Sequence, residues 1–242
     1  MTESNIPTIE RVRHELKMRD VEVVRIDRAS PGFVTITFGC DALADFTSLS
    51  FDDHVKFMFT GPDGEQVRRD YTPRRFDREA NELDLEFALH GHGGAAEWAR
   101  QATVGQRAVI GGPRGSMIVP LAMDWHVLIG DASALPAISR RLEELPQGAR
   151  VQALILVDEA DRRTFDTRAE LDLQWVASGD ELLAALAALA PRPGAGIAWG
   201  GGEAGLMARV RQQLLDIGLP RQATRVSAYW KLGVADHHER LD

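Results

Sequence analysis

The sequence predicts a two-domain protein, in which an N-terminal antiparallel β domain is followed by an α/β domain with a parallel sheet. Up to about residue 120, short segments alternate apolar and polar residues between turn signals, which is typical of a β-barrel or sandwich. From about residue 124, apolar segments of strand length alternate with amphipathic helical segments. We therefore divide the 242 residues into a domain of residues 1–122 and a domain of residues 123–242.

The N-terminal half contains four clear strand patterns. They lie at 21–26, 33–38, 55–59 and 83–89, and the last of these reads LDLEFAL, with an apolar residue at every second position. Turn residues stand between them at 30–32, 61–64 and 111–113. The spacing also predicts a short leading helix over 8–18.

The C-terminal half alternates strands with helices. We expect strands at 126–130, 151–157, 173–177, 196–199 and 224–230, and helices at 135–145, 181–190 and 203–217, with Asp180 capping the second helix. Ligands of such sheets bind beyond the carboxyl ends of the strands. The glycine-containing loops 130–136 and 200–204 follow strands and open helices, so each is as compatible with a nucleotide site as with an ordinary turn.

Composition limits the possible functions. The net charge of −8 argues against a nucleic-acid-binding protein, which needs a basic surface. No apolar run is long enough to cross a bilayer and the first residues resemble no secretory signal, so we expect a cytoplasmic protein without membrane association. The single cysteine, Cys40, excludes an intrachain disulfide and a thiolate cluster, so any redox chemistry would use an organic cofactor or a metal site without cysteine.

The segment Arg69-Asp-Tyr-Thr-Pro-Arg74 carries the sharpest chemical signal. An arginine can pair with phosphate, a tyrosine ring can stack on a flat heteroaromatic, and a threonine hydroxyl can bind a ring nitrogen. A strand end with a buried tyrosine and solvated arginines is an equally good interpretation of the spacing alone.

Further motifs lie in order along nearly the whole chain, at 13–17, 54–59, 69–72, 87–99, 112–116, 130–137, 199–204 and 229–233. Together they resemble the siderophore-interacting protein family, the FAD-dependent ferric-siderophore reductases of the ferredoxin-reductase-like superfamily. The resemblance implies a six-stranded FAD-binding β-barrel and an NAD(P)H-binding α/β domain.

The resemblance also implies roles for residues on the flavin side. Tyr71 would stack on the isoalloxazine, Arg69 would contact a flavin phosphate and Thr72 would bind near the reactive nitrogen. The residues expected to hold the pyrophosphate and adenosine are His90, Gly93, Gly94, Ala95 and Ala96, with Trp98 packing the following helix and with Gly115 and Ser116 bordering the flavin.

On the nucleotide side, the residues expected to receive NADPH or NADH are Ser133, Leu135 and Pro136, with Trp199 and Glu203 lining the same site. Ala132 stands where the family usually has an acidic residue, and Ala95 where it usually has proline. Arg162 and Arg163 would favour NADPH if they hold its 2′-phosphate, but two solvated loop arginines are the more ordinary interpretation.

The substrate side depends on lysines. Lys56 and Lys231 fall inside the family-like motifs and would attract an anionic ferric siderophore, although strand lysines that extend their ammonium groups to solvent would look the same. His90 with His92, and the segment Asp236-His-His-Glu239, raise a metal site as an alternative to solvated side chains.

The leading hypothesis is therefore an enzyme in which NAD(P)H gives a hydride to FAD and single electrons then pass to Fe(III), with release of Fe(II). No catalytic side chain is expected, because the flavin carries the chemistry. A ferredoxin is an alternative donor. A general flavin or ferric-chelate reductase and a non-catalytic flavin- or nucleotide-binding sensor remain open. We expect a monomer, since no exposed apolar helix or heptad pattern is evident.

Overall fold

The computed structural model describes residues 8–61, 63–89, 94–189, 193–234 and 239–241. The chain forms two compact units. We call Glu10–Val119 the β unit and Pro120–Asp242 the α/β unit. The change from one unit to the other falls close to the place where the sequence pattern changes.

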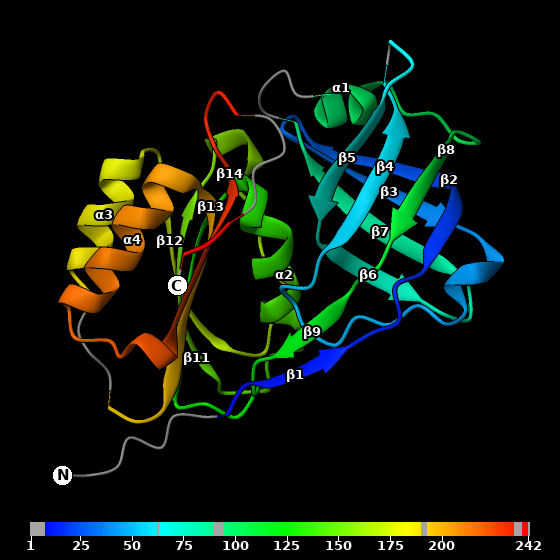
Figure 1. Cartoon of the computed structure of the whole chain (residues 1–242). Coiled ribbons are helices and arrows are strands. Elements are labelled where there is room, and N and C mark those ends of the chain that lie inside the picture. The colour runs from blue at the N-terminus through cyan, green and yellow to red at the C-terminus, as the bar shows by residue number, and fades with distance from the viewer. Residues whose placement is uncertain (1–7, 62, 90–93, 190–192, 235–238, 242) are drawn as a thin grey trace. The chain divides into compact units, whose positions relative to one another are not determined.

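The β unit is built on an antiparallel seven-stranded sheet with the order β5-β4-β8-β2-β3-β7-β6. Its strands are β2 (Met18–Ser30), β3 (Phe33–Gly39), β4 (Val55–Thr60), β5 (Gln66–Tyr71), β6 (Pro73–Asp77), β7 (Glu82–Ala88) and β8 (Arg107–Gly111). The two end strands, β5 and β6, are consecutive in the chain and joined at Thr72, so the sheet curls back toward itself (Figure 1). Among the described residues this sheet has seven strands rather than the expected six, because the chain divides into two strands at Thr72.

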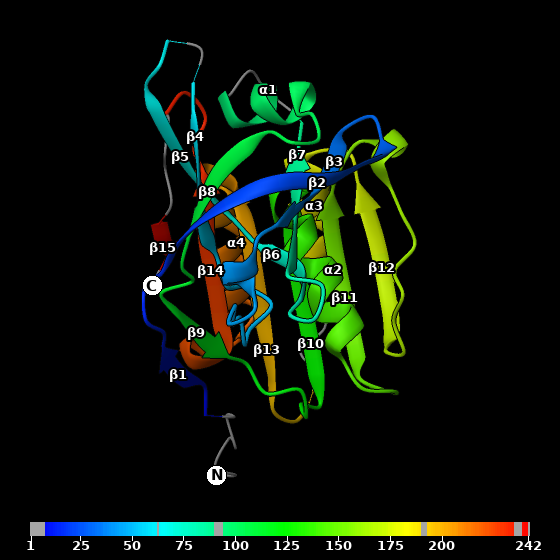
Figure 2. The ribbon, with the colours of Figure 1, turned by 90° about the vertical axis from the view of Figure 1, so that its right-hand side faces the viewer.

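The core of the β unit contains mainly aromatic and branched side chains from the concave face of this sheet. The helix α1 (Gly94–Gln101) lies across one end of the strands (Figures 1 and 2). It places Trp98 on the core, with ring centroids 4.8 Å from Phe57 and 5.7 Å from Phe59. Aromatic contacts therefore connect α1 with β4.

The expected leading helix over 8–18 is wrong. The chain instead forms β1 (Glu10–Arg13), which pairs in antiparallel register with β9 (Gly115–Ile118). A Cβ atom on Gly115 would lie 2.5 Å from the Val12 carbonyl oxygen, so glycine permits this close approach. The pairing satisfies backbone groups of both strands, whereas a helix here would have had no wide apolar face to bury.

The α/β unit contains the five parallel strands that the sequence predicted, and a short antiparallel strand beside them. The order is β12-β11-β10-β13-β14-β15. The strands are β10 (Trp125–Asp131), β11 (Arg150–Leu156), β12 (Glu170–Val176), β13 (Gly196–Glu203), β14 (Thr224–Trp230) and β15 (Glu239–Leu241).

Helices cover both faces of this sheet. The helix α2 (Leu135–Glu144) lies on one face, whereas α3 (Gly179–Ala187) and α4 (Ala204–Asp216) lie on the other (Figure 1). Ser178, and not Asp180, caps α3, because its Oγ accepts a hydrogen bond of 3.1 Å from the Glu181 amide. Short 3₁₀ turns occur at Asp41–Leu43, Ala132–Ala134, Glu159–Asp161 and Arg221–Ala223.

None of the described helices combines the length and the apolar composition that would be required to cross a membrane.

Candidate functional site

The end of β5 brings two of the expected flavin-side residues onto one face. Arg69 lies opposite Phe57 and Tyr71 lies opposite Val55 in the β4–β5 register, and both β4 partners point into the core. Side chains two apart on a strand share a face. Burial raises the pKa of the Tyr71 hydroxyl well above its usual value. The nearby positive charge of Arg69 lowers this pKa by a smaller amount.

Two phenylalanines hold the Tyr71 ring. Its centroid lies 4.3 Å from Phe87 and 5.8 Å from Phe57, in a tilted and an edge-on arrangement. The tyrosine itself is half-buried, so part of it is open to a ligand. Thr72, the next residue, is buried at the bend into β6.

The N-terminal part of α1 lies near this tyrosine, since Trp98 packs on the same two phenylalanines as Tyr71. Ala95 and Ala96 are buried, and Gly94 is exposed at the start of the helix. His90, Gly93 and His92 lie outside the described residues, so their expected roles stay predictions.

Ser116 is held in a buried polar network. Its Oγ donates a 2.5 Å hydrogen bond to Asp53 Oδ2 and accepts from the Leu49 amide at 3.1 Å. His14 Nε2 lies 2.8 Å from the same oxygen and must donate, because the serine hydrogen is directed to Asp53. The hydroxyl is thus fully used by the protein. If Gly115 and Ser116 border a flavin, they do so through their backbone.

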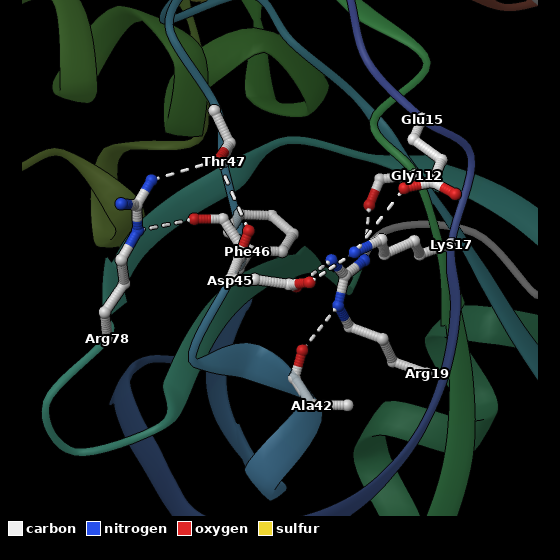
Figure 3. Close-up of polar contacts among 9 residues, drawn as sticks. All are labelled: Glu15, Lys17, Arg19, Ala42, Asp45, Phe46, Thr47, Arg78 and Gly112. Atoms are coloured by element: carbon white, nitrogen blue, oxygen red, sulfur yellow. Dashed lines mark hydrogen bonds and ion pairs between the residues drawn. The ribbon is translucent and has the colours of Figure 1, made fainter.

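The loop between β3 and β4 that leads to Asp53 is held by two arginines (Figure 3). Arg19 is buried and donates to the carbonyls of Ala42 at 2.8 Å and Gly112 at 3.1 Å, and to Asp45 at 2.7 Å. Arg78 donates to the Phe46 carbonyl at 2.8 Å and to the Thr47 hydroxyl at 2.9 Å. Hydrogen bonds from Lys17 and Arg19 lower the pKa of the Asp45 carboxyl to about 2.

Lys56 lies directly opposite Asp70 in the β4–β5 register, on the face away from Arg69 and Tyr71. Its Nζ contacts Asp70 Oδ2 at 2.9 Å, and the lysine side chain is 43% exposed. Much of its charge is therefore balanced by a neighbouring strand residue, which weakens its attraction for an anionic substrate.

In the α/β unit, the carboxyl ends of three strands meet at a carboxylate that sequence reasoning did not select. Asp131 ends β10 and is buried. Its Oδ1 accepts from the Ser133 amide at 2.9 Å and hydroxyl at 2.5 Å. Its Oδ2 accepts from the Glu203 amide at 2.8 Å and from Trp230 Nε1 at 2.9 Å. This residue joins the two loops and the end of the last parallel strand.

The glycines near the carboxyl ends of β10 and β13 fit their protein neighbours closely. A Cβ atom on Gly130 would lie 2.6 Å from the Ala134 Cβ, and one on Gly202 would lie 2.6 Å from Asp131 Oδ2. Their small size is therefore required by packing within the unit itself, which is a more specific reason than the expected approach of a ligand.

The remaining nucleotide-side residues divide into buried and accessible groups. Leu135, Pro136 and Trp199 are buried, and Trp199 packs edge-on against Tyr229 at 6.2 Å. Ser133 and Glu203 are part-exposed and retain polar atoms at this edge of the sheet. Glu203 caps α4, because its Oε2 accepts from the Leu206 amide at 2.9 Å.

Lys231 directly follows β14 and is exposed. It begins a tight turn in which the Val234 amide donates to the Lys231 carbonyl at 3.1 Å. Gly233 has a φ of 77°, which is the conformation of the third residue of a type II turn. The structure thus presents the lysine on a defined turn at the carboxyl end of the sheet.

Two other expectations concern phosphate and metal. Arg162 and Arg163 follow the turn Glu159–Asp161 beyond the carboxyl end of β11, where Arg162 is exposed. Within the described residues no three histidine, cysteine or acidic side chains gather at metal-binding distance. Residues 236–238 lie outside the described part of the chain.

Sequence reasoning missed Asp131, Asp53 and His14 as members of these networks. For Asp131 a signal exists, because an acidic residue between a buried parallel strand and a helix stands where ligand loops begin. For Asp53 and His14 no local pattern indicates the contact, since Ser116 is 63 residues from one and 102 from the other.

Comparison with protein families accounts for most of the chain. A family described as siderophore-interacting FAD-binding domain matches residues 22–68 and 61–117. A family described as siderophore-interacting protein matches residues 123–233. The two matches follow one another along the chain in the order of the β unit and the α/β unit.

Individual proteins show the same likeness. The chain is 34% identical to the NADPH-dependent ferric-chelate reductase of Escherichia coli, over 91% of this chain and 96% of that protein. It is 28% identical to the ferric vibriobactin reductase of Vibrio cholerae, over 65% and 66%. The crystal structure of a siderophore utilization protein from T. fusca superposes with a TM-score of 0.88 at 36% identity, covering 95% of this chain and 98% of that one.

Proposed function

Because this chain belongs to the siderophore-interacting protein family, we propose that it is an FAD-dependent reductase that uses NAD(P)H to reduce ferric siderophores and release Fe(II). The observation that carries the proposal is the half-buried Tyr71 ring at the end of β5, with Arg69 on the same face. We also propose residues 1–122 and 123–242 as the flavin-binding and nucleotide-binding parts.

The residues around Tyr71 fit a flavin. A flat heteroaromatic needs an aromatic partner that does not rotate, and Phe87 and Phe57 hold this one from two sides. The diphosphate needs a cation and free amides, which Arg69 and the start of α1 at Gly94 offer. Bound FAD would accept a hydride from NAD(P)H and pass electrons one at a time to Fe(III).

The protein contributes binding and orientation. Tyr71 is an uncharged phenol in the physiological range, as tyrosines ordinarily are, and burial raises its pKa further, so it adds no negative charge beside the reduced ring. Thr72, buried at the bend after β5, would orient the ring edge. The network of His14, Ser116 and Asp53 fixes β9 against the loop before β4 and so holds the border of the flavin site.

On the nucleotide side, Ser133 and Glu203 are the accessible polar groups at the carboxyl ends of β10 and β13. The first amides of α2 are not available to a diphosphate, because the Leu135 amide donates to the Ala132 carbonyl and Pro136 has no N–H, so the nucleotide would bind beside the Ser133 and Glu203 side chains. The buried side chains of Leu135, Pro136 and Trp199 would shape this site while leaving the polar contacts to their neighbours.

For the ferric substrate we propose Lys231 as the principal cation, because it is exposed on a defined turn. Lys56 has a smaller role, since Asp70 already balances its charge. Ferric siderophores are often anionic, and reduction adds a further negative charge, so a nearby ammonium group favours both binding and the reduced product.

The test is anaerobic stopped-flow with the purified full chain loaded with FAD. We expect bleaching of the flavin by NADPH or NADH, and faster reoxidation by ferric siderophores than by simple ferric salts. Equal reoxidation by both would favour a general ferric-chelate reductase, and binding of flavin without bleaching would favour a sensor. Tyr71→Ala should lower FAD affinity about tenfold, and a chain that takes up no FAD would contradict the proposal.

A ferredoxin donor, a monomeric state and a cytoplasmic location are further parts of the proposal. Replacing NADPH by reduced ferredoxin in the same experiment tests the first. Analytical ultracentrifugation of the loaded protein tests the second, and fractionation of cells that express the chain tests the third.

A further inference from the structure

We propose that Asp131 is a positioning residue that holds Lys231 in place and ties it to the loop expected to bind the nicotinamide nucleotide. The inference rests on the proposed function, because it concerns the lysine assigned there to the ferric substrate. It adds a reason why a buried carboxylate lies among three strand ends.

The two carboxylate oxygens of Asp131 serve different segments. Oδ1 accepts the Ser133 amide and hydroxyl, within its own loop. Oδ2 accepts the Glu203 amide at 2.8 Å and the Trp230 indole at 2.9 Å. Hydrogen bonds to a buried charged acceptor are among the stronger ones in proteins, so the indole orientation is well determined.

Trp230 is the residue immediately before Lys231, and a second contact follows immediately after it. The Leu232 amide lies 3.4 Å from Glu203 Oε1, while Oε2 of the same carboxylate caps α4. Lys231 therefore lies between two tethered residues. These side-chain contacts add to the pairing of Glu203 with Trp230 between β13 and β14 and to the antiparallel bridge between Lys231 and Val234.

The contacts of Trp230 and of Leu232 can be removed one at a time by substitution. Trp230→Phe removes the indole donor, together with part of the ring, and leaves the bonds of Asp131 to Ser133 and Glu203. Leu232→Pro removes the amide that faces Glu203, and proline is favoured at the second position of a type II turn. Leu232 is 79% exposed, so its replacement disturbs no packing.

The experiment uses the FAD-loaded full chain and two readouts. One is the rate of flavin reduction by NADPH, and the other is the half-saturating concentration of the anionic iron(III) complex of 2,3-dihydroxybenzoate. We expect Trp230→Phe to raise the second about five- to tenfold and Leu232→Pro to raise it by less, with flavin reduction unchanged within about twofold. An unchanged half-saturation in Trp230→Phe overturns the inference. If that variant does not fold, Asp131→Asn, in which one acceptor oxygen becomes an amide donor, should give the same rise, and an unchanged half-saturation there overturns the inference instead.

A matched control is Trp125→Phe. This change removes an indole that donates to the Gly194 carbonyl at 3.2 Å, but at the amino-terminal edge of the same sheet. Its half-saturation should stay at the wild-type value, and a rise equal to that of Trp230→Phe would mean that any lost indole bond has this effect.

The double variant Lys231→Gln with Trp230→Phe shows whether the tryptophan acts through the lysine. We expect its half-saturating concentration to equal that of Lys231→Gln alone, because the orientation of residue 231 no longer matters once the lysine charge has been removed. Additive losses would overturn the inference. If Lys231→Gln itself leaves half-saturation unchanged, the substrate role assigned to the lysine fails instead, which distinguishes the two failures.

Discussion

At the scale of single residues, Asp53 and Asp131 have similar structural roles in the two units. Each is a buried carboxylate that accepts backbone amides and side-chain donors from segments far apart in the chain. Such groups cost free energy to bury and are tolerated because several donors satisfy them. Their effect is local order: Asp53 joins the loop before β4 to β9, and Asp131 joins β10 to β13 and β14.

A third buried group, His126, leads to a prediction about acid stability. Burial lowers its pKa to about 4, and the neighbouring Arg141 guanidinium adds to this effect. The folded value lies below the unfolded value of about 6.5, so the folded state disfavours the protonated ring. Stability from this group is complete above pH 6.5 and falls by about 3 kcal/mol as the pH drops toward 4.

His126→Leu removes the group that titrates and should flatten this decline. Urea unfolding of both proteins at several pH values between 4 and 7 provides the measurement. The exposed His54 offers a control, since His54→Gln should retain the decline. A decline of equal size in His126→Leu would show that other groups cause it.

At the scale of elements, the loop between β3 and β4 depends on charged side chains from other strands. The Asp45 carboxylate accepts hydrogen bonds from Lys17 and Arg19, and its folded pKa of about 2 lies below the usual value near 4. The carboxylate therefore stabilises the fold above about pH 4, and this contribution is lost as the pH falls toward 2. Asp45→Asn should lower the urea midpoint at pH 7. The stability of this variant should also depend less on pH between pH 4 and 2.

Asp63, exposed in the turn between β4 and β5, is the matched site for comparison. Asp63→Asn should keep the wild-type midpoint at pH 7. If Asp45→Asn keeps it as well, Arg19 is adequately satisfied by the carbonyls of Ala42 and Gly112, and the ion pair adds nothing to the loop.

The carboxyl end of β13 permits a sharper test of packing. Gly202 has a φ of 156°, and a methyl group there would lie 2.6 Å from Asp131 Oδ2. Gly202→Ala should displace the carboxylate, lower the free energy of unfolding by about 1–3 kcal/mol and raise the half-saturation for the ferric chelate. A methyl group on Gly200 would meet its neighbours at 3.5 Å, an ordinary contact, so Gly200→Ala should be nearly neutral in thermal melts and kinetics.

The sequence predicts those elements whose own residues carry the pattern. The strand at 224–230 has the predicted bounds, and all five parallel strands and three helices of the α/β unit were expected. Of β5 it indicated only the end, at Arg69–Arg74, because the residues QVRRDY show no apolar alternation and that strand is specified by pairing with β4. β1 and β9 were missed for the same reason, since each depends on the other.

The residues of the candidate site also fall into those that local spacing indicates and those that only the fold brings together. Arg69 and Tyr71 were predictable, because their relation is a local spacing on one strand. Asp131 stands where ligand loops begin, but its partners Glu203 and Trp230 are 72 and 99 residues away, so local spacing could not indicate the contacts that it makes. The sequence likewise could not show that Lys56 faces Asp70 across a strand pair.

At the scale of the whole molecule, we expect bound FAD to stabilise the folded state. A ligand that binds only the folded state stabilises it by about 2.7 kcal/mol at 100 times its dissociation constant. For a chain of this length each kcal/mol corresponds to about 2–4 °C, so saturating FAD should raise the Tm by roughly 5–10 °C. Differential scanning fluorimetry with and without FAD measures this shift. Tyr71→Ala should lose most of it at the same FAD concentration, and an unchanged Tm in the wild type would contradict FAD binding.

β12 is one end of the parallel sheet, and its outer edge carries no hydrogen-bonded neighbour among the described strands. Such an edge invites strand addition from a second copy. Glu170, Asp172 and Gln174 alternate along it as exposed residues, while the intervening apolar side chains are half-buried. Two copies that approached edge to edge would bring the carboxylates of Glu170 and Asp172 together, and these would repel. We therefore expect the acidic pattern of β12 to oppose edge-to-edge association of the protein at high concentration.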